Sequence, residues 1–184
     1  MYTYPHTIDN GAGEELTIMR RVDDPGGAYL EAENRVAPGA GPPMHVHYLQ
    51  EEALTVVAGR LGFQRPDAEP QYCGVGETIV FKAGEAHRFW NAGQETLHCT
   101  GYVRPPHNIE YFLTEIFRST KANGGKGPNP IDAAFLSRRY RAEFAILEIP
   151  ALVQRFIFPV LILVGRLTRR LRKYRDAPPP VTAG

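Results

Sequence analysis

Two histidines one residue apart, His45 and His47, are followed within a few residues by the glutamates Glu51 and Glu52. The side chains of a β-strand alternate between its two faces, so the two imidazoles are expected to point the same way. Two imidazoles on one face can bind one cation together, and Glu52 reaches the same point if the chain folds back. Taken alone, this stretch is also compatible with a polar edge strand that binds nothing.

A further candidate ligand, His87, lies in the stretch 74–93, with Gly84 before it and Asn91 after it. A single surface histidine is seldom a ligand. Three histidines and one carboxylate that converge, however, form a donor set that suits a divalent first-row metal. The metal hypothesis therefore depends on a fold that brings the two stretches together.

The elements that must position these residues are short strands. Up to about residue 105 the chain alternates β-rich runs with turns that contain glycine and proline, such as DDPGG, PGAGPP and KAGE. Many short strands at regular spacing are typical of a sandwich or a barrel. The expected strands are residues 16–21, 28–36, 53–59, 60–65, 78–81, 87–91 and 96–103.

Helices are expected in the rest of the chain, because the period of the apolar residues changes from two to about 3.6 after residue 106. The second helix is expected to have Asn129 as its N-cap and Pro130 in its first turn, and to end or kink at Pro150. The apolar face of the first helix consists of Ile109, Phe112, Leu113, Ile116 and Phe117, and that of the second of Leu136, Tyr140, Phe144 and Leu147.

The segment 151–175 joins an apolar run to a basic end. Its uninterrupted apolar run, from Phe156 to Gly165, is too short for a membrane span, which needs about 20 residues. Cationic residues follow, so one expectation is peripheral contact with an anionic membrane surface. The other is that the apolar side packs on the β-domain or on a second subunit while the basic end is solvated.

The 184 residues suit one domain with appendages or at most two small domains. The formal net charge is +1, with 21 cationic and 20 acidic side chains, so no nucleic acid partner is expected. The two cysteines, Cys73 and Cys99, lack C-x-x-C spacing and are expected to be reduced thiols of a cytoplasmic protein. The N-terminus has neither the basic nor the apolar region of a signal peptide.

Both histidine-containing stretches resemble conserved motifs of the cupin superfamily. Residues 39–59 match the first motif, G-x5-H-x-H-x3,4-E-x6-G, at every position. Residues 76–91 match the second motif, G-x5-P-x-G-x2-H-x3-N, except that Lys82 replaces the proline, which changes the stiffness of a turn and not a ligand. The six residues before the last glycine of the first motif select Glu52 as its glutamate, and Glu51 is expected to face outward by alternation.

The resemblance implies a mainly β fold, the double-stranded β-helix or small jelly-roll barrel of cupins, with a C-terminal α-helical extension outside it. It also implies that His45, His47, Glu52 and His87 meet inside the barrel as a metal set like that of quercetinase-like cupins. Such a set accepts Fe, Mn, Ni or Zn, and the sequence does not distinguish between them.

The pocket beside the metal is expected to be largely apolar. Alternation along the two ligand-bearing strands puts Leu54, Val56 and Phe89 on the inward face. His98, on a later strand, is assigned to the pocket as a further polar group that supports the site; the alternative is an outward polar face or a subunit contact. Such a pocket suits a small, partly apolar molecule with one or two oxygens.

The expected division of the chain is a cupin barrel in residues 1–106, helices in 107–176 that pack on the barrel or on a partner, and a mobile tail in 177–184. A homodimer is expected, because cupin barrels often dimerise and the C-terminal helices carry apolar faces.

The fold alone does not choose a function. The favoured hypothesis is a metal-dependent enzyme that acts on a small organic substrate by dioxygenase-type chemistry, with Glu52 as a ligand that also acts as base. One alternative is a non-oxidative isomerase or cyclase. The other is a metal-dependent small-molecule binding or sensing protein without turnover. No phosphate-binding loop, dinucleotide fingerprint or Ser/His/Asp arrangement is found in the sequence.

Overall fold

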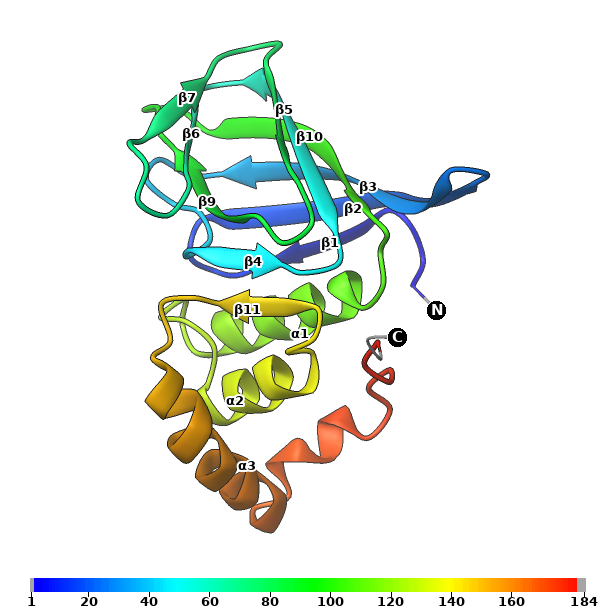
Figure 1. Cartoon of the computed structure of the whole chain (residues 1–184), viewed down its shortest axis with the longest axis vertical. Coiled ribbons are helices and arrows are strands. Elements are labelled where there is room, and N and C mark those ends of the chain that lie inside the picture. The colour runs from blue at the N-terminus through cyan, green and yellow to red at the C-terminus, as the bar shows by residue number, and fades with distance from the viewer. Residues whose placement is uncertain (1, 182–184) are drawn as a thin grey trace.

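A β-barrel sits above a helical extension in the computed structural model, which describes residues 2–181 (Figure 1). One sheet has the strand order β1-β2-β3-β10-β5-β8 and the other the order β11-β4-β9-β6-β7. The strands are β1 His6–Asp9, β2 Glu14–Asp24, β3 Gly27–Val36, β4 His45–His47, β5 Glu51–Ala58, β6 Leu61–Gln64, β7 Gln71–Cys73, β8 Thr78–Phe81, β9 Ala86–Asn91, β10 Leu97–Arg104 and β11 Phe144–Ile146.

All the strand pairs are antiparallel, and the order in each sheet shows that the chain crosses repeatedly between the two sheets. This is a double-stranded β-helix, and the predicted mainly β barrel with a helical extension is confirmed. The expected strands are present, with β2 longer than predicted. Alternating apolar residues fill the barrel between the sheets, among them Val36, Leu54, Val56, Leu61, Phe63, Phe81, Phe89, Leu97 and Cys99.

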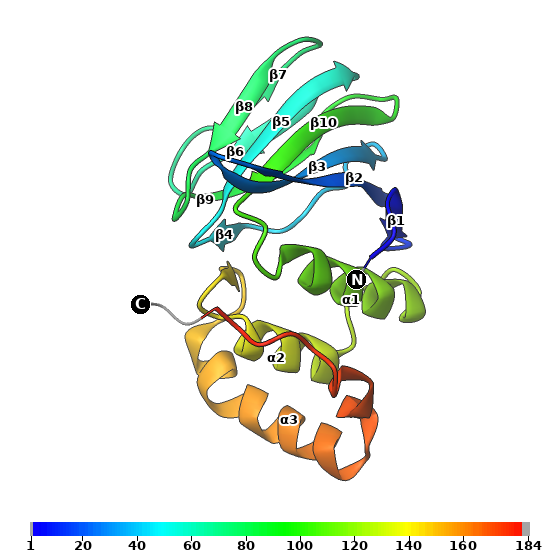
Figure 2. The same cartoon turned by 90° about the vertical axis from the view of Figure 1, so that its right-hand side faces the viewer.

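The helical extension lies under one end of the barrel (Figure 2). As predicted, Asn129 caps the second helix: its side-chain oxygen accepts a hydrogen bond from the backbone N–H of Ile131 at 3.0 Å, and Pro130 occupies the first turn. The helices are α1 Ile109–Ala122, α2 Pro130–Arg139, a π-helical turn Val153–Ile157, α3 Phe158–Leu167 and a 3₁₀ turn Arg170–Tyr174.

The prediction that the second helix continues towards Pro150 is wrong. Helix α2 ends at Arg139, and Phe144–Ile146 forms β11, which pairs with β4 so that Phe144 lies opposite His47. The edge of β4 needs a hydrogen-bonding partner, and that tertiary contact overrides the helical period of the sequence. A strand from the helical extension therefore completes the sheet that carries three of the candidate ligands, His45, His47 and His87.

Helix α3 packs on α2 rather than on the barrel (Figure 2). Its Gly165 is buried, and a side chain there would collide with Ile131 of α2 and with Leu171. Two packing partners are expected for the extension, the barrel or a second subunit. In the structure the extension contacts the barrel through helix α1, which packs against β1. Within residues 2–181, no helix has both the length and the apolar character to cross a membrane.

The described part of the predicted mobile tail, residues 177–181, is hydrogen-bonded to the helical extension. The backbone oxygen of Pro178 accepts from Arg139 Nη2 at 2.9 Å, and the N–H of Val181 donates to the buried Glu143 at 3.2 Å. These contacts hold the described part of the expected mobile tail against the helical extension, and residues 182–184 lie outside the described residues.

Candidate metal centre

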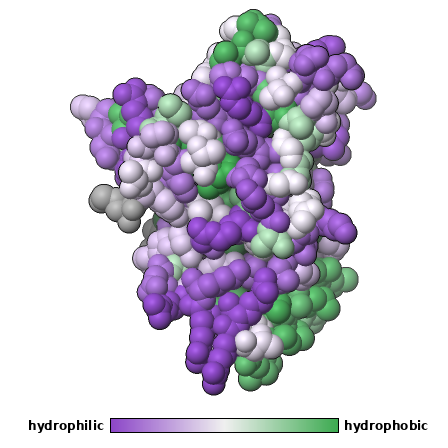
Figure 3. All heavy atoms as spheres, turned by 180° about the vertical axis from the view of Figure 1, so that it is seen from behind, coloured by the Kyte–Doolittle hydropathy of each residue, from purple (hydrophilic) through white to green (hydrophobic). Residues whose placement is uncertain are grey.

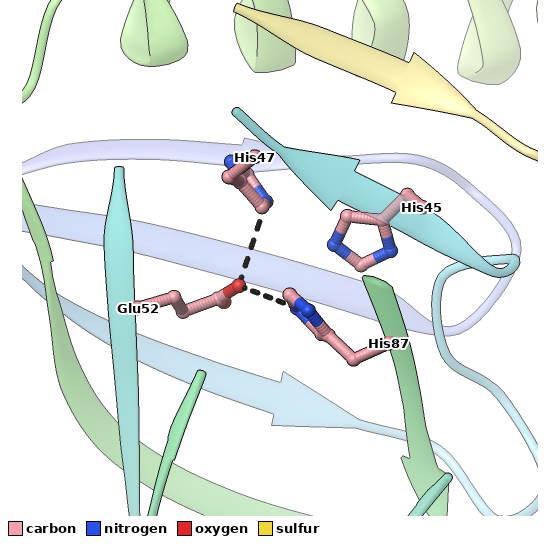
Figure 4. A group of neighbouring side chains, drawn as sticks. All are labelled: His45, His47, Glu52 and His87. Carbon is pink, nitrogen blue, oxygen red and sulfur yellow. Dashed lines mark hydrogen bonds and ion pairs between the residues drawn. The ribbon is translucent and has the colours of Figure 1, made fainter. Parts of the chain in front are cut away.

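Four side chains from three strands converge at the end of the barrel nearest the helices (Figure 4). His45 and His47 come from β4, Glu52 from β5 and His87 from β9, and each offers one ligand atom within 4.8 Å of the others. Strands β4 and β9 are neighbours, with His45 directly opposite His87. The structure thus brings together all four residues that the motifs selected, and leaves Glu51 elsewhere, where it accepts a hydrogen bond from Tyr102 at 2.7 Å.

Glu52 holds the centre of this cluster. Its Oε2 atom lies 3.1 Å from Nε2 of His87 and 3.5 Å from Nε2 of His47. The carboxylate comes from the opposite sheet to the histidines, so that donors surround one point from both sides (Figure 4). A cation at that point would be shared by the two sheets.

Backbone carbonyls orient two of the imidazoles. Nδ1 of His45 lies 2.8 Å from the oxygen of Pro43, and Nδ1 of His87 lies 2.9 Å from the oxygen of Glu85. Since a carbonyl only accepts, each Nδ1 carries a proton, and each Nε2 faces the cluster. In proteins, metal-binding histidines are held in this way, so the observed hydrogen bonds fit a metal site.

The electrostatics of the cluster favour the protonation states that a cation requires. Burial, with added repulsion from His47 and His87, lowers the pKa of His45 to about 3, and burial lowers the pKa of His47 as well. Burial acts to raise the pKa of Glu52, but the hydrogen bond with His87 and the neighbouring imidazoles outweigh it and lower that pKa to about 2. At neutral pH, His45 and His47 are thus neutral donors and Glu52 is a carboxylate, which suits a divalent first-row metal.

A cavity of about 440 Å³ lies beside the cluster, between the barrel and the helical extension. His45, His47 and Glu52 form part of its wall, so a ligand in the cavity can reach the cluster. Its volume is within the range of small-molecule sites. Most of the other wall residues are apolar and come from both parts of the chain: Phe89 and Val103 from the barrel, and Phe112, Leu113, Ile116 and Phe117 from α1.

The four predicted pocket residues occupy four different environments. Phe89 lines the cavity, and Leu54 lines a smaller neighbouring cavity that also reaches Glu52. Val56 is buried in the barrel core and lines neither cavity. The expectation that His98 supports the site is corrected: it points to the outer face of β10 and its Nε2 lies 3.2 Å from Glu33, because alternation turns its buried neighbour Cys99 inward instead.

Sequence reasoning missed a second polar group in the cavity wall, formed by Glu14 on β2 and Asn34 on β3. Both side chains are buried, and Nδ2 of Asn34 donates to Oε1 of Glu14 at 3.2 Å. Oδ1 of Asn34 is buried without a hydrogen-bond partner among the described residues. The signal was available: alternation along β2 places Glu14 on the same face as the buried Ile18.

Burial raises the pKa of Glu14 to about 7, and the charge of Glu52 adds to the rise although the hydrogen bond from Asn34 opposes it. Two carboxyl groups therefore share one cavity wall with opposite pKa shifts. Environments that separate the pKa values of two acids in this way are typical of acid–base sites.

Comparison with known families matches residues 33–101 to the cupin domain, a range that includes all four clustered residues. Among solved structures, the chain is similar to the polyketide cyclase RemF from Streptomyces resistomycificus, with 22% identity, coverage of 56% of this chain and 78% of that one, and a TM-score of 0.45. It is also similar to a predicted oxalate decarboxylase from Thermotoga maritima, with 21% identity, coverage of 54% and 90%, and a TM-score of 0.44. No curated protein matches the chain.

Proposed function

The chain belongs to the cupin superfamily, and on that premise we propose that it is a metal-dependent enzyme that acts on a small, largely apolar organic molecule. The observation that carries the proposal is the opening of the four-residue cluster into an apolar cavity. His45, His47, Glu52 and His87 would hold the cation. A divalent cation held there would polarise a substrate oxygen and make neighbouring protons more acidic.

The cavity wall supports a substrate with an apolar body and oxygen atoms at two places. Phe89 from the barrel and Phe112 from α1 offer apolar contact to the body. One oxygen would face the cluster, and another would face Glu14 and Asn34, whose unpaired Oδ1 accepts a hydrogen bond from a substrate hydroxyl. Ketones and phenols with a second oxygen have this chemistry.

We assign proton transfer to Glu14 and cation binding to Glu52. A carboxylate with a pKa of about 2 is a weak base, whereas a carboxyl group with a pKa of about 7 both accepts and returns a proton near neutral pH. Glu14 would take a proton from a carbon next to the polarised carbonyl and return it at another position. This is non-oxidative isomerase or cyclase chemistry, and Glu14 favours it over the alternatives.

Deuterium exchange tests this function. Zinc-loaded protein is incubated without oxygen in D₂O with a panel of aryl ketones and aryl diketones, and exchange beside the carbonyl is followed by NMR. Exchange that is lost in Glu14→Gln, while metal content is unchanged, supports the proposal. Exchange that is equally fast in Glu14→Gln would show that Glu14 is not the base.

Dioxygenase chemistry remains the second candidate, and the apolar wall supports it because apolar cavities admit dissolved oxygen. The same panel, extended with catechols and flavonoids, is tested in an oxygen electrode with iron-, manganese- or nickel-loaded protein. Oxygen uptake that requires His87 supports this candidate. Tight ligand binding with neither exchange nor oxygen uptake would instead support a binding or sensing role.

A further inference from the structure

The last helical region exposes a row of large apolar side chains on the side that faces away from α2 (Figure 3). In Figure 3 they form a continuous apolar patch over α3, next to a strongly hydrophilic stretch. Between 41% and 75% of each residue is exposed. We call this set the outer face; it consists of Leu152, Phe156, Ile157, Val160, Leu163, Val164 and Leu167.

The fold of the chain does not account for the outer face. The opposite side of the same helix is also apolar, and its Phe158 and Ile162 are buried in the core of the helical extension. One apolar side is enough to attach a helix to its domain. A contiguous exposed patch of this kind marks a surface that meets an apolar partner.

Positive charge flanks the outer face, mostly at its C-terminal end. Residues 151–175 contain seven arginines and lysines and no acidic residue. Arg170 and Lys173 are paired with Asp132, and Arg175 with Asp176. In the described part of the chain, Arg155, Arg166, Arg169 and Arg172 are exposed and form no ion pair.

We propose that the outer face docks on an anionic lipid surface, with α3 lying in the plane of the interface. The exposed apolar side chains would enter the boundary between headgroups and acyl chains, and the unpaired arginines would contact lipid phosphates. This goes beyond the proposed function and does not depend on it.

A second copy of the chain fits the outer face less well. Parallel pairing of α3 with α3 would bring the two basic ends together, and antiparallel pairing would place each basic end beside Arg155 of the other copy; neither arrangement offers an acidic residue from either segment to neutralise the charge. An anionic membrane neutralises the same charges. Charge complementarity therefore selects the lipid surface.

Vesicle sedimentation tests the proposal with the full chain. The protein is expected to bind vesicles that contain phosphatidylglycerol, to bind pure phosphatidylcholine vesicles much more weakly, and to dissociate from the former as salt is raised. Arg172→Gln should weaken binding about five-fold, the usual effect of one cation at such a surface. Val160→Gln should weaken it roughly ten-fold, because a buried apolar contact is lost.

Two matched variants on the barrel serve as controls. Val75→Gln changes an exposed valine and Arg35→Gln an exposed arginine, both outside the helical extension, and neither should alter vesicle binding. The proposal is overturned if the unmodified protein does not bind phosphatidylglycerol vesicles, or if the control variants lose as much binding as the α3 variants. It is also overturned if light scattering shows that the unmodified protein is a dimer and the Val160→Gln variant a monomer, and neither protein binds the vesicles.

Discussion

Nε2 of His87 lies 3.1 Å from Oε2 of Glu52, although the two residues are 35 positions apart and stand in different sheets of the barrel. His87 is 1% exposed, and the ring of Phe81 stacks on it at a centroid distance of 3.8 Å. A packed ring with a carbonyl on Nδ1 has one orientation, so Nε2 is fixed towards the carboxylate. The barrel therefore preorganises the cluster before any cation arrives.

Replacing His87 with alanine should abolish stoichiometric metal binding, because one of four donors is lost and the carboxylate loses its hydrogen bond. We expect metal affinity to fall at least about 100-fold, in line with the loss of a ligand or its support. Elemental analysis of protein purified without added metal measures the effect. His98→Ala is the matched control, since the side chain of His98 points out of the barrel from β10. Equal loss of metal in both variants would contradict the assignment of His87 as a ligand.

The four clustered residues could be predicted from the sequence because their positions follow from local rules. Alternation puts His45 and His47 on one face, and the glycine spacing of the motifs distinguishes Glu52 from Glu51. The strand β11 could not be predicted in this way, because its pairing depends on the free edge of β4 and not on its own period. His98 was assigned to the wrong environment because alternation gives two faces and does not say which one is inward.

Glu14 should make the protein less stable at high pH than a glutamine variant. Its pKa is raised from 4.5 to about 7 in the folded state, so the folded chain holds the proton more tightly than the unfolded chain. The stability that this proton contributes is complete below about pH 4.5 and is lost as the pH rises towards 7. At about 1.4 kcal/mol per pKa unit, the loss is roughly 3 kcal/mol.

Urea unfolding of the wild type and of Glu14→Gln, at about pH 5 and about pH 8, measures this difference. Glutamine mimics the protonated acid, so the two proteins should be similarly stable at the lower pH and the variant more stable at the higher pH. Glu15→Gln, on the exposed face of the same strand, should follow the wild type at both. A stability difference that does not change with pH would mean that Glu14 titrates normally.

Asp132 should anchor the basic C-terminal segment to α2. It is fully buried and accepts hydrogen bonds from Ser119 at 2.7 Å, Lys173 at 2.8 Å and Arg170 at 2.9 Å. Burial acts to raise its pKa, but the hydrogen bonds from Arg170, Lys173 and Ser119 outweigh burial and lower that pKa. Asp132→Asn should cost about 2 kcal/mol of unfolding free energy, since the half-exposed cations regain water while the buried amide pairs poorly.

The matched control for this anchor is Asp176→Asn. Asp176 is also paired with an arginine, Arg175, but the side chains of both residues are more than 80% exposed. An exposed pair of this kind contributes little, so the control should unfold like the wild type. If both variants lose the same stability, net charge rather than the buried contacts of Asp132 is responsible.

Phe144 should link the helical extension to the metal cluster. Its ring lies 5.5 Å from that of His47 and 4.9 Å from that of Phe112 on α1, and its strand β11 pairs with β4. His47 also has a buried Nδ1 without a hydrogen-bond partner in the described residues, so packing rather than a carbonyl orients this ligand. Phe144→Ala should cost about 3 kcal/mol or more of stability and lower metal affinity roughly ten-fold.

Urea unfolding and competition with a metal chelator measure the two effects of Phe144→Ala. Leu147→Ala, just beyond β11, removes a half-exposed side chain and should leave both quantities nearly unchanged. A variant that unfolds more easily but binds metal with wild-type affinity would show that the barrel alone positions His47. If Phe144→Ala loses metal affinity and Leu147→Ala does not, the helical extension is part of the metal site. That role would explain why a strand from outside the cupin motifs completes this sheet.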